Sequence, residues 1–287
     1  MDAGHVLSVR DYFAHISLWP HPIALNPRAW LSNFDDVDKG IARHLLDGFV
    51  YMNSRLVDRC FHAAFRRLGT RQLAETSAES AEERWTELRD HALFSFPSIN
   101  PTDSGHMFVR IMRDDFGVDE GRIYELDDLV AELTGLTTPP PVVLVDDFIG
   151  TGDQFLRTVR KPWAGGTSLL DEMSRLGVTS AHYVVAVASG MAKDRIESSS
   201  PFGVSAGNVL PSSSSLRAPN THLVAPSIRA AAVDLVERYS RVAGIPEHMV
   251  WGYRGSGLAV SFEHKTPNNT LPLFTWKENG WIPLTTR

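Results

Sequence analysis

Two nearly uninterrupted apolar runs restrict the folds that this chain can adopt. They read "VVLV" at residues 142–145 and "AHYVVAVAS" at 181–189. Strands of a parallel sheet are covered on both faces, so they show continuous apolar runs of this kind instead of polar and apolar alternation. The segments between the two runs, "DQFLRTVR" and "TSLLDEMSRLG", have helical spacing. This order of strands and helices predicts a doubly wound α/β core with a parallel sheet.

The sequence that precedes this core predicts a helical N-terminal region over residues 1–92. Apolar residues recur at three- and four-residue spacing from Asp35 to Leu68, which indicates an amphipathic helix or a helix pair. Residues 71–92 predict a more polar helix. Residues 1–34 are rich in Pro, Trp and His, and they predict an irregular, packed arm.

The core itself is expected over residues 93–225. "LFSF" predicts a strand, "HMFVRIMRDDF" a helix and "GRIYEL" another strand, whereas the Ser- and Pro-rich segment 197–219 predicts a mobile loop. The last region, 226–287, is expected to pack on the core. It predicts a helix over 226–243 and then a C-terminal β-hairpin, in which "GLAVSFEH" and "LPLFTW" flank the turn "KTPNNT".

Charge and composition limit the partners of the chain. The net charge is −6 over 287 residues, and no cluster of Lys and Arg is dense enough to indicate direct nucleic-acid binding. Cys60 is the only cysteine, which excludes an intrachain disulfide and a thiolate metal cluster. The sequence contains no run of about 18 apolar residues, so it predicts no membrane-spanning helix. A cytoplasmic protein without membrane contact is therefore expected.

The stretch "PPPVVLVDDFIGTGDQF" combines two carboxylates with a glycine-rich turn. Ligands of open parallel sheets sit beyond the carboxyl ends of the strands, and Asp146 and Asp147 are expected at such an end. Gly150, Thr151 and Gly152 follow and lead into a helix, where converging backbone N–H groups favour a phosphate. The two carboxylates can accept hydrogen bonds from a vicinal diol. The stretch therefore predicts a site for a ribose 5-phosphate.

This stretch resembles the phosphoribosyl-pyrophosphate (PRPP) motif of type I phosphoribosyltransferases: four aliphatic residues, two acids, two apolar residues and a small-Thr-Gly turn. The resemblance implies a type I phosphoribosyltransferase-like core that binds PRPP with Mg²⁺, and it places a flexible hood over 127–141. Asp146 and Asp147 would be the catalytic, ribose-binding pair. The 5'-phosphate would contact Gly150, Thr151, Gly152, Asp153 and Gln154, and the diphosphate would contact Ser104, Gly105 and Lys193.

Three segments, the middle one within the stretch above, extend the resemblance over most of the chain. "WLSNF", "DDFIGTGDQF" and "FEHKTPNNTLPLFTW" resemble phosphoribosyltransferase-like proteins of bacterial conflict systems, including some retron anti-phage operons. That branch implies a defence effector. Its partners would be a reverse transcriptase with its DNA product and a helix-turn-helix protein. Acceptor-side contacts would come from His264, Asn268 and Asn269, although Asn residues in such a turn are also turn formers.

Several positions depart from the family pattern and keep other functions open. Gly150 stands where classical members often carry a polar residue, Asp153 brings a negative charge to a phosphate loop, and Gln154 replaces a hydroxyl. A non-catalytic sensor of PRPP or a nucleotide is one alternative. Another is an S-adenosylmethionine-dependent methyltransferase, whose first motif has a similar acid and glycine pattern. The simplest alternative is a strand end followed by a helix cap.

Overall fold

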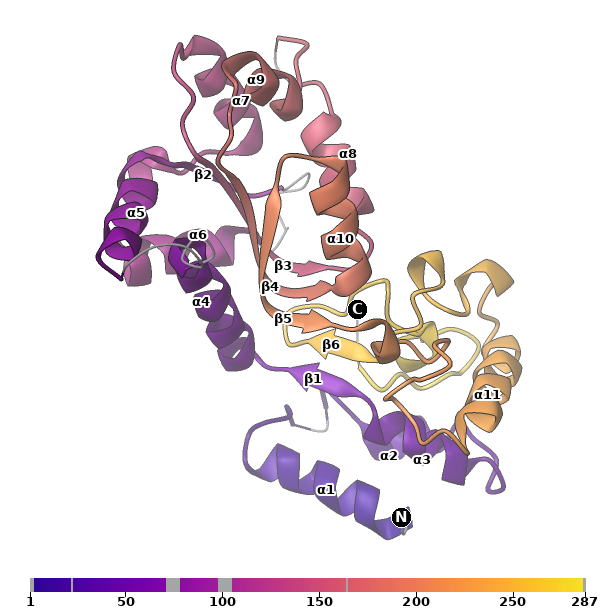
Figure 1. Ribbon diagram of the computed structural model, residues 1–287. Coiled ribbons are helices and arrows are strands. Elements are labelled where there is room, and N and C mark those ends of the chain that lie inside the picture. The colour runs from indigo at the N-terminus through magenta and orange to yellow at the C-terminus, as the bar shows by residue number, and fades with distance from the viewer. Residues whose placement is uncertain (1–2, 22, 71–77, 98–104, 164, 286–287) are drawn as a thin grey trace. The chain divides into compact units, whose positions relative to one another are not determined.

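A computed structural model describes residues 3–21, 23–70, 78–97, 105–163 and 165–285 (Figure 1). The chain forms two compact units. Unit 1 combines Met1–Val57 with Leu210–Arg287, and unit 2 comprises Asp58–Val209. None of the described helices has both the length and the apolar character that crossing a membrane requires.

Unit 2 contains a four-stranded sheet in the order β2-β3-β4-β5. The strands are β2 (Leu93–Ser95), β3 (Val142–Ile149), β4 (Ala181–Ser189) and β5 (Gly203–Leu210). Strand β3 pairs in parallel with β2 and with β4. The predicted α/β class with a parallel sheet is therefore confirmed, and both apolar runs of the sequence are central strands.

Helices cover both faces of this sheet (Figure 1). One face packs against α7 (Leu126–Gly135), α8 (Asp153–Arg160), α9 (Leu169–Leu176) and α10 (Gly190–Ser199), and their apolar side chains form one cluster with alternate strand residues. The opposite face packs against α4 (Ser54–Thr70) and α6 (Gly105–Phe116), with α5 (Ala78–His91) beside them. On this second face, Phe65 stacks on Phe94 and Phe61 contacts Phe108.

A glycine sets how closely α4 approaches the sheet in unit 2. A Cβ atom at Gly207 of β5 would lie 1.9 Å from the carbonyl oxygen of Cys60, so any side chain there would collide with backbone. Two hydrogen bonds reinforce the contact. Ser205 donates to the carbonyl of Ala64 at 2.7 Å, and Arg67 donates to that of Ala206 at 2.7 Å.

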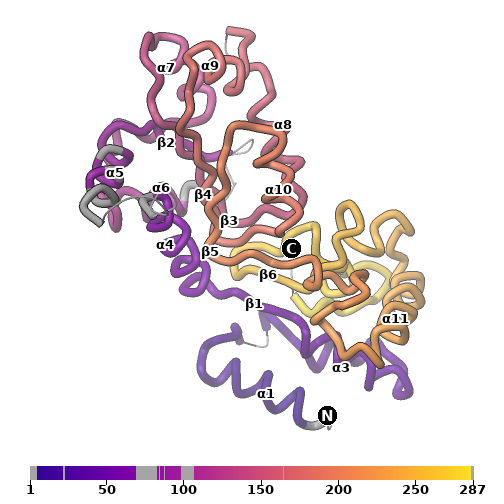
Figure 2. The backbone as a smooth tube through the Cα atoms, in the orientation of Figure 1, coloured from indigo at the N-terminus to yellow at the C-terminus, as the bar shows by residue number. Residues whose placement is uncertain are grey.

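Unit 1 is built from both ends of the chain (Figure 2). Its two strands, β1 (Val50–Met52) and β6 (Val260–Phe262), pair in parallel although more than 200 residues separate them in sequence. Aromatic side chains fill the core: the rings of Trp30 and Phe274 stack, and Phe34 contacts Trp281. The helices are α1 (Ala3–His15), α2 (Pro27–Leu31), α3 (Lys39–Asp47) and α11 (Arg229–Val242).

The structure corrects several expectations for the N-terminal residues and for the connections. Residues 1–34 contain α1 and α2 and are not an irregular arm, and the helical stripe from Asp35 is interrupted by β1. The segment 127–141, expected as a hood, is largely α7, whose buried leucines pack on the sheet cluster. "GRIYEL" forms only an isolated bridge between Ile123 and Phe94.

The C-terminal part also differs from the prediction. The segment 197–219, expected as a mobile loop, includes the end of α10 and all of β5, because Val204 and Ala206 are apolar enough to be buried in the sheet cluster. The expected hairpin does not form: β6 pairs with β1, and "LPLFTW" contains a 3₁₀ turn at Pro272–Phe274. This pairing joins both chain ends in one unit, a division that differs from the expected limits at residues 92 and 225.

Candidate functional site

The two carboxylates lie within β3 and not beyond its end. Pairing with β4 continues past Asp146, opposite Val185, to Ile149, opposite Ala188. Adjacent side chains of a strand point to opposite faces of the sheet, so Asp146 and Asp147 diverge. Asp146 is partly buried, whereas Asp147 is only 1% exposed. The acids are therefore unequal: Asp146 is the more accessible carboxylate.

A buried tyrosine holds the side chain of Asp146. The Tyr183 hydroxyl donates to one carboxylate oxygen at 2.8 Å, and the amide of Asp147 donates to the other at 2.8 Å. The Tyr183 ring stacks on Phe155, with ring centroids 4.0 Å apart. Burial, and then the charge of Asp146, raise the pKa of Tyr183 well above its ordinary value. Tyr183 is therefore a permanent donor that orients Asp146.

Sequence reasoning did not identify Tyr183. Its signal was a phenol within an otherwise apolar strand, because a buried tyrosine hydroxyl normally requires a hydrogen-bond partner. In a parallel sheet the neighbouring strand supplies such partners. The residues opposite and diagonal to Tyr183 on β3 include Leu144 and Asp146, and only the second can accept a hydrogen bond.

The turn after β3 depends on Gly152. This residue has a φ of 75°, in the left-handed region that favours glycine, and it immediately precedes α8. A Cβ atom there would lie 3.1 Å from Cγ1 of Ile196 on α10. The backbone conformation therefore favours glycine, and the space for a side chain is tight. Gly152 also brings no capping side chain to the N-terminus of α8.

Helix α10 fixes the direction of the turn. The Ser189 hydroxyl donates to the carbonyl oxygen of Gly150 at 2.6 Å, and Arg195 donates to that of Thr151 at 3.0 Å. In a trans peptide the N–H group points opposite to its carbonyl. The N–H of Thr151 therefore points away from the Ser189 hydroxyl, and the N–H of Gly152 points away from the Arg195 guanidinium.

Asp153 does not oppose a phosphate as strongly as the sequence suggests. Its carboxylate is 2.6 Å from the Arg195 guanidinium and accepts a hydrogen bond from the Thr151 hydroxyl at 3.2 Å. The side chain of Asp153 is only 11% exposed. Its charge is thus paired with Arg195, which also holds the turn. Gln154 lies exposed in the first turn of α8.

Two of the three residues expected to contact the diphosphate, Gly105 and Lys193, lie within the described residues. Lys193 lies on α10 and pairs with Glu197, whose second oxygen accepts a hydrogen bond from the amide of Val204 at 3.0 Å. Gly105 is the first residue of α6. Ser104 lies outside the described residues. Lys193 is therefore already engaged by a carboxylate, and a diphosphate would have to displace that pairing.

The three expected acceptor-side residues lie in unit 1, where Asn268 and Asn269 shape a turn. The carbonyl of Asn268 accepts from the amide of Tyr253 at 2.7 Å. The Asn269 side chain donates to the Ser256 hydroxyl at 2.8 Å, and Asn269 is buried. His264 is exposed beside Phe262, with ring centroids 5.8 Å apart. The contacts of the two asparagines are those of turn-forming residues.

A metal ion at this site would need ligands from elsewhere. Among the described residues, no group of three or more His, Cys, Asp and Glu side chains is arranged to hold one. Mg²⁺ commonly keeps several waters and binds one or two carboxylates together with substrate phosphates. Asp146, the more accessible of the two acids, fits that limited role, whereas no cage formed by the described residues alone does.

Comparison with known proteins gives one result. A family model described as PRTase-CE matches residues 27–287, which is nearly the whole chain. No curated protein and no solved structure matches significantly.

Proposed function

Because the chain belongs to the PRTase-CE family, a phosphoribosyltransferase-like family, we propose that it binds PRPP or a related ribose 5-phosphate and transfers the phosphoribosyl group. The observation that carries this proposal is the turn after β3. Ser189 and Arg195 hold its carbonyls, which turns the amides of Thr151 and Gly152 away from these two side chains, and N–H groups at a helix N-terminus favour a phosphate. An oriented carboxylate, Asp146, precedes this turn by a few residues on the same strand.

In this function the two parts of the motif have separate roles. The amides of Thr151 and Gly152, with the N-terminus of α8, hold the 5'-phosphate. Asp146 accepts a hydrogen bond from a ribose hydroxyl, and Tyr183 fixes the direction of that carboxylate. Asp147, which is buried on the opposite face, completes the acid pair of the motif and requires a local opening to reach the sugar.

The reaction requires stabilisation of charge at two places. As diphosphate leaves, positive charge develops at the anomeric carbon, and a carboxylate near the ribose stabilises it. Mg²⁺ bound with PRPP would neutralise part of the diphosphate charge. Lys193 is the described cation closest in sequence to this edge of the sheet, and it would exchange Glu197 for diphosphate.

Titration calorimetry of the full chain with PRPP and Mg²⁺ tests the proposal. Replacing both acids, Asp146→Asn with Asp147→Asn, should weaken binding by about 1–3 kcal/mol through loss of charge-assisted hydrogen bonds. Asp146→Asn alone should account for most of this loss, because Asp147 is buried. Asp127→Asn on α7 is the matched control. Unchanged affinity in the double variant would contradict the ribose assignment.

A non-catalytic sensor is the second candidate, and the engaged cations favour it. Arg195 pairs with Asp153 and Lys193 with Glu197, and Gly150 supplies no side chain for catalysis. An enzyme should release diphosphate from PRPP, slowly with water and faster with its acceptor, and the acid-pair variants should lose that release. A sensor should bind PRPP without turnover. The methyltransferase alternative has less support, because β4 ends at Ser189 and not at an acid.

The wider biological role rests on resemblance to conflict-system proteins. We propose a cytoplasmic anti-phage effector that is held inactive by a reverse transcriptase with its DNA product and by a helix-turn-helix protein. The net charge of −6 supports contact with DNA only through such partners. Tight, salt-sensitive binding of the isolated chain to DNA would contradict this arrangement.

A further inference from the structure

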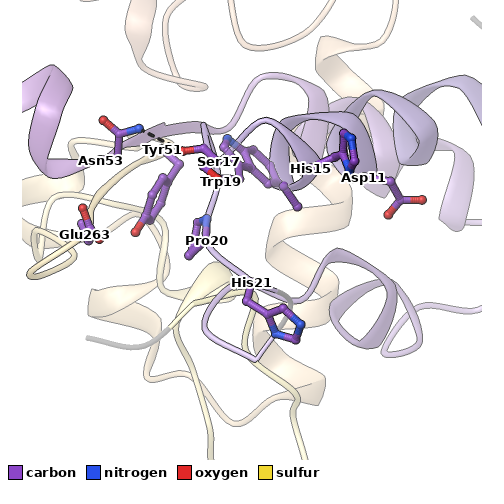
Figure 3. Close-up of a pocket in the computed structure, with 10 residues that line it drawn as sticks. Asp11, His15, Ser17, Trp19, Pro20, His21, Tyr51, Asn53 and Glu263 are labelled. Atoms are coloured by element: carbon purple, nitrogen blue, oxygen red, sulfur yellow. Dashed lines mark hydrogen bonds between the residues drawn. The ribbon is translucent and has the colours of Figure 1, made fainter.

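Unit 1 contains a cavity at the carboxyl ends of its two parallel strands (Figure 3). Its volume is about 570 Å³, which is within the range of small-molecule sites. β1 ends at Met52 and β6 at Phe262, so Asn53 and Glu263 follow the strands at the same edge. Ligands of parallel sheets bind beyond this edge. The cavity therefore lies where the fold favours a ligand.

Tyr51 presents a hydroxyl group to this cavity. Tyr51 is only 7% exposed, and its hydroxyl extends between Glu263 and Pro20 (Figure 3). Within the described residues this hydroxyl makes no hydrogen bond. Burial, and then the charge of Glu263, raise the pKa of Tyr51 to about 12. At neutral pH it is therefore an uncharged hydroxyl that can still bond a ligand.

Glu263 has one carboxylate oxygen left for a ligand. Its Oε2 accepts hydrogen bonds from both the amide and the hydroxyl of Ser54, each at 2.6 Å. Within the described part of the chain, Oε1 accepts none. The bonds from Ser54 hold the pKa of Glu263 below its ordinary value. The side chain is therefore an ionised, positioned carboxylate at neutral pH.

The charge of the cavity is negative. Asp11 and Glu263 line it, whereas the described lining includes neither Lys nor Arg. Asp11 pairs with Arg28 at 2.5 Å, so the uncompensated charge is that of Glu263. Trp19 and Tyr51 add aromatic walls, and rings of this kind attract cations. The Trp19 ring already lies 4.7 Å from the Arg10 guanidinium carbon.

We propose that this cavity binds a small organic cation through a guanidinium or ammonium group. Oε1 of Glu263 accepts its N–H, the Tyr51 hydroxyl accepts a second hydrogen bond, and the aromatic walls cover its apolar part. Seven lining residues, from Asp11 to His21, precede residue 27, where the family match begins. The site does not depend on the proposed phosphoribosyl ligand.

A pair of ligands of equal shape tests the charge. Methylguanidinium and N-methylurea are nearly isosteric, but only the first is a cation. Protein-detected NMR titration of the full chain should show methylguanidinium binding about tenfold or more tightly than N-methylurea, the scale of a charge-assisted hydrogen bond. Agmatine, which adds an ammonium group, should bind more tightly than methylguanidinium. Equal binding of the neutral ligand would overturn the proposal.

Two variants locate the site. Glu263→Gln keeps an acceptor oxygen for Ser54 but removes the charge, and it should weaken agmatine binding about tenfold. Tyr51→Phe removes a hydroxyl that has no partner in the described residues, so the fold should persist while agmatine binding falls about threefold. Tyr12→Phe, on the exposed side of α1, is the control and should have no effect. Unchanged agmatine affinity in Glu263→Gln and Tyr51→Phe would overturn the proposal.

Discussion

Among the helices that begin directly after parallel strands, α4 and α8 have N-termini that the protein satisfies in opposite ways. Before α4, the Asn53 side chain accepts from the amide of Leu56 at 2.9 Å, and Glu263 accepts from that of Ser54. Before α8, Gly152 offers no side chain, and the nearest hydroxyl, that of Thr151, approaches the amide of Asp153 only at 3.4 Å. The protein caps the N-terminus of α4 with its own side chains, whereas the N-terminus of α8 carries the proposed phosphate site.

In the proposed function, the anion site is therefore made by the absence of a capping side chain. Every helix N-terminus has amides without intrahelical partners and a partial positive charge. Where a carboxylate and an amide oxygen satisfy them, as at α4, the neighbouring cavity becomes negative and suits a cation. Where glycine replaces the cap and a neighbouring helix holds the carbonyls, as at α8, the amides suit a phosphate. The same strand-to-helix element would thus give the two proposed sites, which bind ligands of opposite charge.

Adding a carboxylate at the N-terminus of α8 should make it resemble the capped N-terminus of α4. Gly152→Asp places a like charge and a side chain in the turn, and we expect PRPP binding to become undetectable by calorimetry. Gly152→Ala introduces only the left-handed strain and the contact with Ile196. It should cost about 1–2 kcal/mol of unfolding free energy and retain weaker binding. Equal PRPP affinity in both variants would show that charge at this turn does not matter.

Replacing Arg195 should destabilise the turn that precedes α8, because Arg195 holds this turn from the side of α10. Arg195→Gln leaves the largely buried Asp153 without its ion pair and weakens the bond to the Thr151 carbonyl. Because Arg195 is 40% exposed, we expect a loss of about 1–2 kcal/mol in unfolding free energy by urea denaturation. PRPP affinity should fall as well. Arg157→Gln, on the exposed face of α8, is the control and should change neither quantity.

Loss of the Asn53 cap at the N-terminus of α4 should lower the stability of the protein without changing PRPP affinity. Asn53→Ala removes the acceptor for the amide of Leu56 and should lower the unfolding free energy by about 1 kcal/mol. PRPP affinity should stay unchanged, in contrast to Arg195→Gln. A clear fall in PRPP affinity would mean that the two N-termini are not independent.

The smallest expected effect is a pH dependence at α4. The pKa of Glu263 is lower in the folded chain than its ordinary value of 4.5. Its contribution to stability is therefore complete above about pH 4.5 and is lost as the pH falls through the lower folded value. Because Glu263 is largely exposed, a few tenths of a kcal/mol are expected. Thermal denaturation of Glu263→Gln should be less sensitive to acid below pH 4.5 than that of the wild type.

The sequence predicted the central strands better than the chain ends. Continuous apolar runs of this length are typical of covered strands, and the acid pair and the glycine turn are local in sequence, so both could be predicted without a structure. The pairing of β1 with β6 could not, since each strand has three residues and its partner lies at the other end of the chain. The short segment "LPLFTW" has strand-like composition, but its proline begins a 3₁₀ turn.

For the candidate site, too, the sequence predicted the residues that are adjacent along the chain but not those that other elements contribute. The residues of the turn follow one another in sequence, whereas Tyr183 and Ser189, which orient it, come from the next strand and from its junction with α10. Their role requires knowledge of the register between β3 and β4. The different accessibility of Asp146 and Asp147 likewise follows from the continuation of β3 to Ile149, which the turn-like composition of "GTG" did not reveal.

The construction of unit 1 from both chain ends has a consequence for the order of events during synthesis. The ribosome adds about 5–20 residues per second, and completed units fold as they emerge. Unit 2 is complete once residue 209 has emerged, but β1 has no partner until residues 260–262 have been made. Trp30, Phe34 and Phe49 therefore remain uncovered through most of translation. The N-terminal segment is thus the part of the nascent chain most in need of a chaperone.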